Sequence, residues 1–482
     1  MAPVSLLMAM ATGFLVLRLS VLGDRDTFRP DPASVVFQGA LSFGLGVGAS
    51  SLLYFLWLLG VGAPGKWYPF AEVLLLAALA GTWAMKIARA REPDGAFSGR
   101  KEEKARGDVW SRTVTGHFLL ILCLATAVGV LISLNRPHGN WDAWAMWNMK
   151  ARFLFLGGDR WKDLFSVVGE LHLDYPLLLP GWIARWWYYA GGDGVLFPAA
   201  TSLLFLMATA GLLYAALASL APGHGGILSG ICLLGTAPFL REGASQYADV
   251  PLAFYILATI VLLLIGNRTG RGGYRVLAGI SAGLAGWTKN EGAMFLLALA
   301  VSHLAVVGTR EGIRAYLRQA IHFFAGLAPF LAVLVYFKWS FAPPSGAVFT
   351  EGLVATLGKV LDTSRHYTVL ASFLGQFYLF GGPLYVVYFL LAGRGGERRD
   401  ATSVRLPVLL LALMSVAYYY VYLTTTAPLE WHLNNSLRRI VTQMFPVFLF
   451  AFFLRARTPA PVSETSIPPA GKPRGRNRKR GK

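Results

Sequence analysis

The sequence predicts an all-α protein that crosses a membrane many times, with about 13 transmembrane helices. Hydrophobic residues make up 55% of the 482-residue chain and charged residues only 14%, whereas soluble domains carry about 25% charge. The mean hydropathy is +0.51, and the apolar residues gather in runs long enough to span a bilayer. This composition excludes a disordered chain, which needs low hydrophobicity and high net charge.

Thirteen apolar runs are predicted as spans, because a helix of about 20 apolar residues satisfies its own backbone polar groups in lipid. They lie near 3–20, 35–59, 67–87, 115–134, 195–217, 226–240, 249–266, 275–288, 291–308, 321–340, 373–391, 406–424 and 440–454. The runs near 226–240, 275–288 and 440–454 are short, and one pair could form a re-entrant loop. The first run lacks a basic start and a small-residue cleavage site, which favours a helix over a signal peptide.

The net charge of +19 is explained by membrane topology rather than by nucleic-acid binding. If the N-terminus lies outside and the C-terminus in the cytoplasm, 30 of the 44 Lys and Arg residues fall in inner segments. This bias predicts that orientation and no nucleic-acid partner. We separately expect the membrane to be a bacterial inner membrane. Cys123 and Cys232 lie in separate apolar runs, which predicts inert core residues.

The chain divides into four predicted parts. Three N-terminal transmembrane helices occupy 1–90, and a charged cytoplasmic linker follows at 91–114. A transmembrane catalytic core fills 115–455. Residues 456–482 form a disordered basic cytoplasmic tail, which we expect to touch anionic membrane lipids.

The most informative region is the large outer loop 135–194, which is dense in Trp and Tyr, residues that prefer the membrane interface. Amphipathic interfacial helices are predicted over 141–156 and 177–189. Transporters normally have short loops between spans. Two interfacial helices therefore favour a site that acts at the membrane surface on a lipid-linked molecule.

Three outer acids are the candidate catalytic residues. Asp142 opens the first interfacial helix, Asp174 lies in the segment HLDYP, and Asp249 begins a span. An unpaired acid at a membrane boundary is costly and is often functional. The alternatives are helix N-terminal roles for Asp142 and Asp249 and a turn for Asp174.

Cations on the same side are candidates for binding a phosphate, because arginine contacts phosphate through paired donors. They are Arg241, Lys289, Arg438 and Arg439, all of which break the positive-inside trend. Lys289 lies close to Glu291 in the segment GWTKNEG. The alternative is that these side chains only extend to lipid head groups.

Five motifs in this order resemble the integral-membrane glycosyltransferases of the C superfamily (GT-C fold), which include protein O-mannosyltransferases and the lipid A aminoarabinose transferase. They are NWDAW with Asp142, HLDYPLLLP with Asp174, YADVPLAFY with Asp249, LAGWTKNEG with Lys289, and RRIVTQMFP with Arg438 and Arg439. The resemblance covers about 115–455. The chain departs from the family pattern in its three earlier helices and in an Asp142 without a neighbouring Glu. It also has Tyr175 after Asp174, at a position where the aminoarabinose-transferase pattern has a basic residue.

The resemblance implies inverting transfer of a sugar from a polyprenyl-phosphate donor to a hydroxyl group of an envelope glycolipid, glycan or protein on the outer face. Asp142 is the expected base, while Asp249 and Asp174 would orient the acceptor or share that role. The expected substrate- and phosphate-binding residues are Lys289, Arg438, Arg439, Arg241, Glu291, Tyr175 and His432. No cofactor is required, although two outer acids could hold one divalent metal ion.

Two other functions stay open at this point. A lipid-linked sugar flippase or other transporter would need ionisable residues near the membrane centre, whereas these acids gather at one face. A polysaccharide polymerase or O-antigen ligase would be expected to use outer arginines and a histidine, and His172, His366 and His432 all lie on the outer side.

Overall fold

The computed structural model describes residues 1–21, 31–89, 109–166, 172–221, 223–343, 352–395 and 401–459. The only β-type pairing among these residues is an isolated bridge between Arg394 and Ala456, and the elements are helices. An all-helical architecture is the one expected inside a membrane, because each helix satisfies its own backbone. Most of the predicted linker 91–114 and of the predicted tail 456–482 lies outside the described residues.

Ten helical units among the described residues are long and apolar enough to cross a membrane, which supports a polytopic integral membrane protein. They are α1 (Ala2–Ser20), α2 (Pro32–Gly60), α3 (Trp67–Arg89), α4 (Val109–Asn135), α7 (Leu196–Leu220), α10 (Asp249–Thr269), α12–η3–α13 (Asn290–His303, Leu304–Gly308, Thr309–Glu311), α14 (Ile313–Ser340), α18 (Ala401–Thr424) and α19–η4–α20 (Leu429–His432, Leu433–Leu437, Arg438–Arg455). The units η3 and η4 are single π-helical turns.

About thirteen spans are predicted, and ten or eleven helical units among the described residues have the length and hydropathy of a span. All thirteen predicted segments are helical, but α8 (Gly225–Gly235) is only about 16 Å long and is followed by the short α9 (Ala237–Gly243). Similarly, α11 (Gly272–Thr288) is about 26 Å long, against a hydrocarbon core of about 30 Å. These two helices are packed between longer neighbours and do not meet the length of a span by themselves.

The predicted span 373–391 is broken in two. Helices α16 (Thr363–Leu379) and α17 (Gly382–Ala392) meet at 64°, so they count as an eleventh span only if taken together. Gly381 adopts a left-handed conformation with φ of +80°, and Pro383 near the start of α17 cannot donate a backbone hydrogen bond to the preceding turn.

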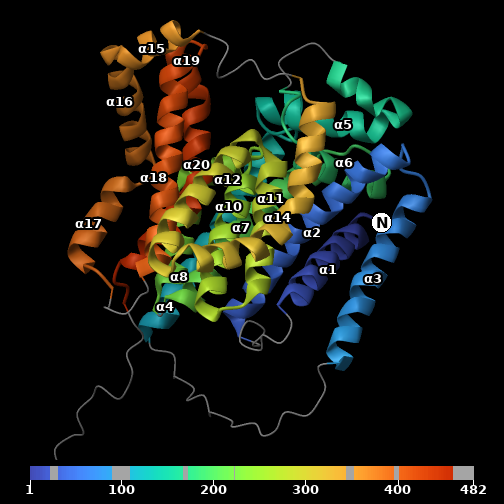
Figure 1. The fold of residues 1–482 in the computed structure, drawn as a ribbon, viewed down its shortest axis with the longest axis horizontal. Coiled ribbons are helices and arrows are strands. Elements are labelled where there is room, and N and C mark those ends of the chain that lie inside the picture. Colours follow the sequence, from blue (N-terminus) through green and yellow to red (C-terminus); the bar gives the residue numbers. More distant parts are fainter. Residues whose placement is uncertain are drawn as a thin grey trace, which may run out of the picture.

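The almost wholly buried α10 lies at the centre, in contact with α7, α11 and α20. Helices α15 (Leu353–Leu361), α16 and α17 form one flank of the molecule, and α3 forms the opposite flank (Figure 1). Helix α1 packs on α2, and α2 packs on α6 and α7. The helices of the predicted N-terminal part, 1–90, are therefore joined to the core through α2.

Glycines bring two helix pairs into backbone contact. A Cβ atom added at Gly46 of α2 would lie 2.0 Å from the carbonyl oxygen of Ala9 in α1, and one at Gly13 would lie 2.0 Å from that of Ser42. Similarly, a Cβ atom at Gly279 of α11 would lie 1.9 Å from the carbonyl oxygen of Phe323 in α14. Small residues permit this close packing, which stabilises helix pairs in membranes through van der Waals contact.

In the described part of the loop 135–194, the chain forms four short helices. They are the π-helical turn η1 (Ala143–Trp147), α5 (Asn148–Leu156), the 3-10 helix η2 (Gly158–Ser166) and α6 (Leu178–Ala190). Both predicted interfacial segments are thus helical, and Trp141 and Trp144 are exposed as expected. Helix α6 differs from the expected surface helix, because it is buried against α1, α2, α5 and α7.

Polar contacts within the protein explain why α6 is buried. The guanidinium of Arg185 pairs with the carboxylate of Glu72 in α3 at 2.6 Å, and both side chains are almost fully buried. The indole nitrogen of Trp182 donates to the Thr201 hydroxyl at 3.0 Å. Aromatic and charged residues that suit a membrane interface therefore face other helices here.

Candidate functional site

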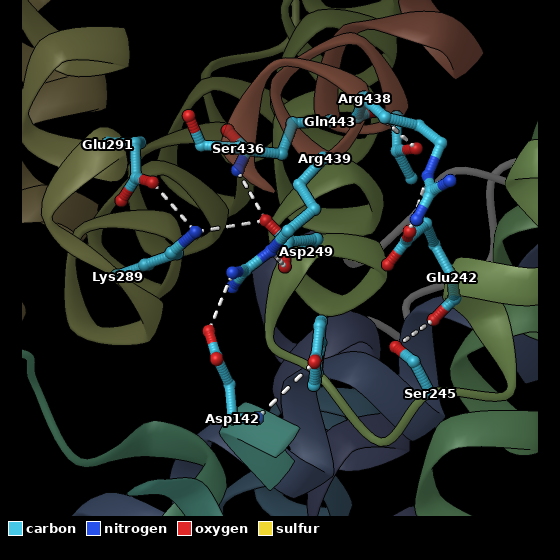
Figure 2. A network of polar contacts seen from close by, with 12 residues as sticks. Asp142, Glu242, Ser245, Asp249, Lys289, Glu291, Ser436, Arg438, Arg439 and Gln443 are labelled. Atoms are coloured by element: carbon cyan, nitrogen blue, oxygen red, sulfur yellow. Dashed lines mark hydrogen bonds and ion pairs between the residues drawn. The ribbon is translucent and has the colours of Figure 1, made fainter. Parts of the chain in front are cut away.

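Four segments that are distant in sequence meet at one end of the bundle, which we call the site face. They are the start of η1 with Asp142, the start of α10 with Asp249, the break between α11 and α12 with Lys289, and the start of α20 with Arg439. Figure 2 shows Arg439 reaching between Asp142 and Asp249, with Lys289 beyond Asp249.

Arg439 links the two candidate catalytic acids. Its Nη1 atom lies 2.6 Å from Oδ2 of Asp142, and its Nε atom lies 3.0 Å from Oδ2 of Asp249. The guanidinium also lies over the ring of Tyr247, 4.5 Å from the ring centre, which adds a cation–π contact. The planar fork of arginine is suited to hold two carboxylates at a fixed separation.

Asp249 is the most enclosed member of the network. Its side chain is 0% exposed, and its Oδ1 atom accepts hydrogen bonds from Lys289 Nζ at 3.0 Å and Gln443 Nε2 at 2.6 Å. Lys289 also pairs with Glu291 at 2.7 Å. A buried carboxylate with three donors around it is compensated in charge and in hydrogen bonding, so it can stay ionised away from water.

A second ion pair extends the network to α9. Arg438 Nε lies 3.0 Å from Oε1 of Glu242, and the Arg438 side chain is 48% exposed while that of Glu242 is 3% exposed. Burial raises the pKa of the Glu242 carboxyl, and the neighbouring Asp249 charge raises it further. Ser245 donates to the Glu242 carbonyl oxygen at 2.7 Å and so fixes the end of α9.

The helix-capping alternatives for Asp142 and Asp249 find no support. Asp142 precedes η1 and Asp249 is the first residue of α10, yet neither side chain accepts a capping hydrogen bond from its own helix. Both carboxylates are turned instead toward Arg439. Their position at helix N-termini still favours the negative charge through the helix dipole.

Asp174 joins the site through Asn290, the residue after Lys289. The Asn290 amide donates to Oδ2 of Asp174 at 2.5 Å, and Lys338 Nζ donates to Oδ1 of Asn290 at 2.6 Å and to the backbone carbonyl of Asp174. These bonds tie the loop 135–194 to α12 and α14. Asp174 is therefore more than a turn residue, because its carboxylate contacts another helix.

A cluster of Lys150, His172, Tyr175 and Trp147 lies next to Asp174. Lys150 Nζ donates to the His172 carbonyl at 2.5 Å, and burial lowers the pKa of Lys150 to about 7, an effect that Asp174 opposes and Lys338 reinforces. The Tyr175 ring stacks on His172 and Trp147, with centre separations of 5.0 and 5.7 Å. Burial raises the pKa of Tyr175, so it stays neutral and offers an apolar ring face.

The structure brings together most of the residues predicted for the site. Five of them form a row of ion pairs in the order Asp142, Arg439, Asp249, Lys289 and Glu291. The other predicted residues lie next to this row or apart from it. Arg438 pairs with Glu242 next to the network, Asp174 contacts Asn290, and Tyr175 lies near the Lys289 ammonium, which is 5.8 Å from its ring centre.

Two predicted residues lie apart from this network. Arg241 is exposed on α9, and no hydrogen bond or ion pair joins it to the network within the described part of the chain. His432 contacts Thr425 through Nδ1 at 2.8 Å and packs on Tyr422. The positions of Arg241 and His432 give no support to their predicted roles in binding phosphate or substrate.

Several contributing residues were absent from the prediction, among them Gln443, Asn290, Lys338 and Tyr247. Lys338 could have been noticed as an ionisable residue at the end of a long apolar helix. Gln443 lies one helical turn after Arg439, on the same face. Nothing in the sequence distinguishes Tyr247, whose hydroxyl accepts from the Asp142 backbone amide at 3.3 Å.

The described residues contain no group of three or more His, Cys, Asp or Glu placed to hold a metal ion. At the site face a guanidinium lies between Asp142 and Asp249. The acids that could share a divalent ion therefore share Arg439 in this arrangement.

Comparison with known proteins adds no assignment. No protein-family model matches the chain, and neither a curated protein nor a solved structure matches it. The function must therefore be argued from the chemistry of this network.

Proposed function

We propose that the protein is a membrane glycosyltransferase that moves a sugar from a polyprenyl-phosphate donor to an acceptor hydroxyl at the site face. The observation that carries this proposal is the Asp142–Arg439–Asp249–Lys289 network, in which one partly exposed acid is backed by buried charges from three other segments. Glycosyl transfer needs a base for the hydroxyl and cations for the departing phosphate, and this site offers both.

Asp142 is the base in this proposal. Its side chain is 27% exposed while that of Asp249 is 0% exposed, so an acceptor can approach Asp142 more easily. Arg439 engages Oδ2 of Asp142 and leaves Oδ1 without a partner among the described residues. Oδ1 would take the proton of the hydroxyl as its oxygen attacks the anomeric carbon.

Arg438 is the best-placed cation for the phosphate. The bond from the anomeric carbon to the phosphate oxygen breaks as the new bond forms, and the electron pair leaves with the lipid phosphate. Lys289 is only 4% exposed and enclosed by Asp249 and Glu291, whereas Arg438 is 48% exposed and uses Nε for Glu242. Its Nη atoms could therefore meet phosphate oxygens, which charge-assisted hydrogen bonds stabilise strongly.

Asp249 and Lys289 act as positioning residues in this scheme. Asp249 holds Arg439 through Nε, and Lys289 and Gln443 hold Asp249. The network fixes Arg439, and through it the orientation of Asp142, before any substrate binds. Preorganised charges of this kind lower the barrier without reorganisation during the reaction.

The test is sugar transfer by the purified protein from radiolabelled polyprenyl-phosphate sugars to crude envelope acceptors. We expect Asp142→Asn to lower the rate by roughly 100-fold or more, because a lost general base costs 10²–10⁴-fold. The substitution keeps the shape of the side chain but removes one charge from the ion pair with Arg439, so the thermal unfolding midpoint is measured as well and shows that the variant is folded. Asp193→Asn is a matched control, since Asp193 lies in the same loop and pairs with Arg152 at 2.9 Å.

Two results would argue against the proposal. Undiminished transfer by Asp142→Asn would remove Asp142 from the role of base and move it to Asp174 or Asp249. Absence of transfer with every donor, together with movement of a donor across liposomes that contain the protein, would replace the glycosyltransferase with a flippase.

A further inference from the structure

A polar cavity lies at the end of the bundle opposite to the site face. It has a volume of about 330 Å³, within the range of small-ligand pockets. Its lining comes from the turn between α10 and α11, the first turn of α11, the end of α13 and the N-terminal part of α14: Gly270, Gly272, Arg275, Glu311, Ala315, Arg318, Gln319 and His322. The 21 residues of α10 separate this cavity from Asp249 by about 30 Å, so it is independent of the site face.

The cavity has a buried polar wall. Arg275 and Gln319 are each only 8% exposed, although both are polar and line an open space. Gln319 donates through Nε2 to Oε2 of Glu311 at 2.8 Å, while its Oε1 atom is buried without a hydrogen-bond partner among the described residues. An unpartnered buried acceptor costs free energy, which a ligand that supplies a donor would recover.

The lining offers both donors and acceptors. Arg275 and Arg318 are cationic donors, whereas Glu311 and Gln319 offer oxygen acceptors. A ligand that fits both sets carries an anionic phosphate and, a few bonds away, an amine or hydroxyl group. A simple anion would leave the Gln319 acceptor unmatched.

The position of the cavity indicates the source of such a ligand. It lies where α10 ends and α14 begins, and both helices are long and apolar enough to cross the membrane, so the cavity lies at the level of the lipid head groups. Gly272 makes room for this arrangement, because a Cβ atom there would lie 2.4 Å from Cδ2 of His322.

We propose that this cavity binds a glycerophosphodiester head group that bears a hydrogen-bond donor, as in phosphatidylethanolamine or phosphatidylglycerol. Arg275 and Arg318 contact the phosphate, and Glu311 and Gln319 accept from the amine or hydroxyl. Because the cavity lies away from the site face, this assignment stands whether or not the protein transfers sugars.

The test is lipid binding to the full-length purified protein by native mass spectrometry, with phosphatidylethanolamine, phosphatidylglycerol and phosphatidylcholine as probes. Phosphatidylcholine carries the phosphate but no donor at its head group. We expect it to bind about tenfold more weakly, the scale of one lost hydrogen bond to a charged group. Soluble glycerophosphoethanolamine is the fourth probe and identifies whether acyl chains contribute.

Two variants separate the parts of the site. Arg318→Gln should weaken the binding of phosphatidylethanolamine and phosphatidylglycerol about tenfold, because it removes a phosphate contact. Gln319→Leu should reduce the preference over phosphatidylcholine, because only the Glu311 acceptor remains. Arg314→Gln is the matched control, since Arg314 is exposed on the same helix one turn earlier and does not line the cavity.

The outcomes are distinguishable. Tight lipid binding with weak binding of the soluble compound supports a membrane lipid as the ligand, and equal binding of both supports the same site with a free phosphodiester as its ligand. Equal affinity for all three lipids, or equal losses in Arg318→Gln and Arg314→Gln, would overturn the proposal. Thermal unfolding of each variant shows that a loss of binding comes from a folded protein.

Discussion

The guanidinium of Arg439 fixes the relative positions of two carboxylates at the site face. Arg439 contacts Asp142 and Asp249 through different nitrogen atoms, so each carboxylate limits where the other can lie. A lysine in this position would carry the same charge on a single nitrogen atom and would lack the planar fork that spans two acids. The identity of this residue, as well as its charge, therefore matters for the geometry.

Lys150 leads to a pH-dependent prediction. Its pKa is about 7 in the folded protein because it is buried, against an ordinary value of 10.5. The unfolded chain therefore binds more protons between these values, and the stability of the folded protein rises from pH 7 to pH 10. For this one group the slope is up to about 1.4 kcal/mol per pH unit.

Lys150→Met should remove this part of the pH dependence, because methionine fills a similar volume without a charge. The measurement is the thermal unfolding midpoint in one detergent at pH 7, 8, 9 and 10. The exposed Lys162→Met, in the same loop, serves as the control and should keep the slope of the wild type. Identical slopes for wild type and Lys150→Met would mean that the protonation of Lys150 does not differ between the folded and unfolded states in this pH range.

The contact between α1 and α2 yields a prediction at the scale of elements. Gly46→Ala should lower the free energy of unfolding by about 1–3 kcal/mol, because the new methyl group would meet the Ala9 carbonyl at 2.0 Å. Gly39→Ala in the same helix has nothing within 4 Å and should be neutral or stabilise by up to about 1 kcal/mol. Unfolding midpoints in detergent compare the two, and equal midpoints would show that α1 moves away without cost.

Elements could be predicted from the sequence more fully than their breaks. The thirteen helical segments follow from apolar runs, which are a local property. The bend between α16 and α17 depends on two or three residues around Gly381, and π-helical turns such as η4 have no apolar pattern of their own. Hydropathy alone therefore predicts about thirteen spans, while ten or eleven of the described helical units have the length and hydropathy of a span.

The site was predictable only in part for a related reason. Asp142, Asp249 and Lys289 stand out because charge at a membrane boundary is unusual, and the structure places them together. Their partners are long-range: Arg439 is 190 positions from Asp249 and 297 from Asp142. Gln443 is an ordinary polar residue until Tyr418 and Asp249 are seen around it.

Two chemically different ends define the whole molecule. The site face carries paired acids and bases, and the opposite end carries the cavity lined by Arg275 and Arg318. The distribution of Lys and Arg predicts that the site face lies outside the cytoplasm. Arg241 and Arg314 are exposed at the two ends and can report the orientation.

We expect Arg241→Cys to react with a membrane-impermeant maleimide in intact cells, and Arg314→Cys to react only after permeabilisation. The background is the protein with Cys123 and Cys232 replaced by alanine, so that one thiol is present. The reverse labelling pattern would invert the orientation and would place the proposed transfer in the cytoplasm. Labelling of both thiols after permeabilisation is the control for reactivity.

The π-helical turns at the site face have a consequence for the ancestry of the site. Asp142 directly precedes η1, and Arg438 and Arg439 directly follow η4, so both partners of the Asp142–Arg439 pair border a turn with one residue more than an α-helical turn. Deleting one residue from η4 would restore a continuous α-helix and rotate one side of it by about 100° relative to the other. In a phylogeny of related proteins, we expect a one-residue gap at this turn to coincide with gain or loss of the Asp142–Arg439 pair.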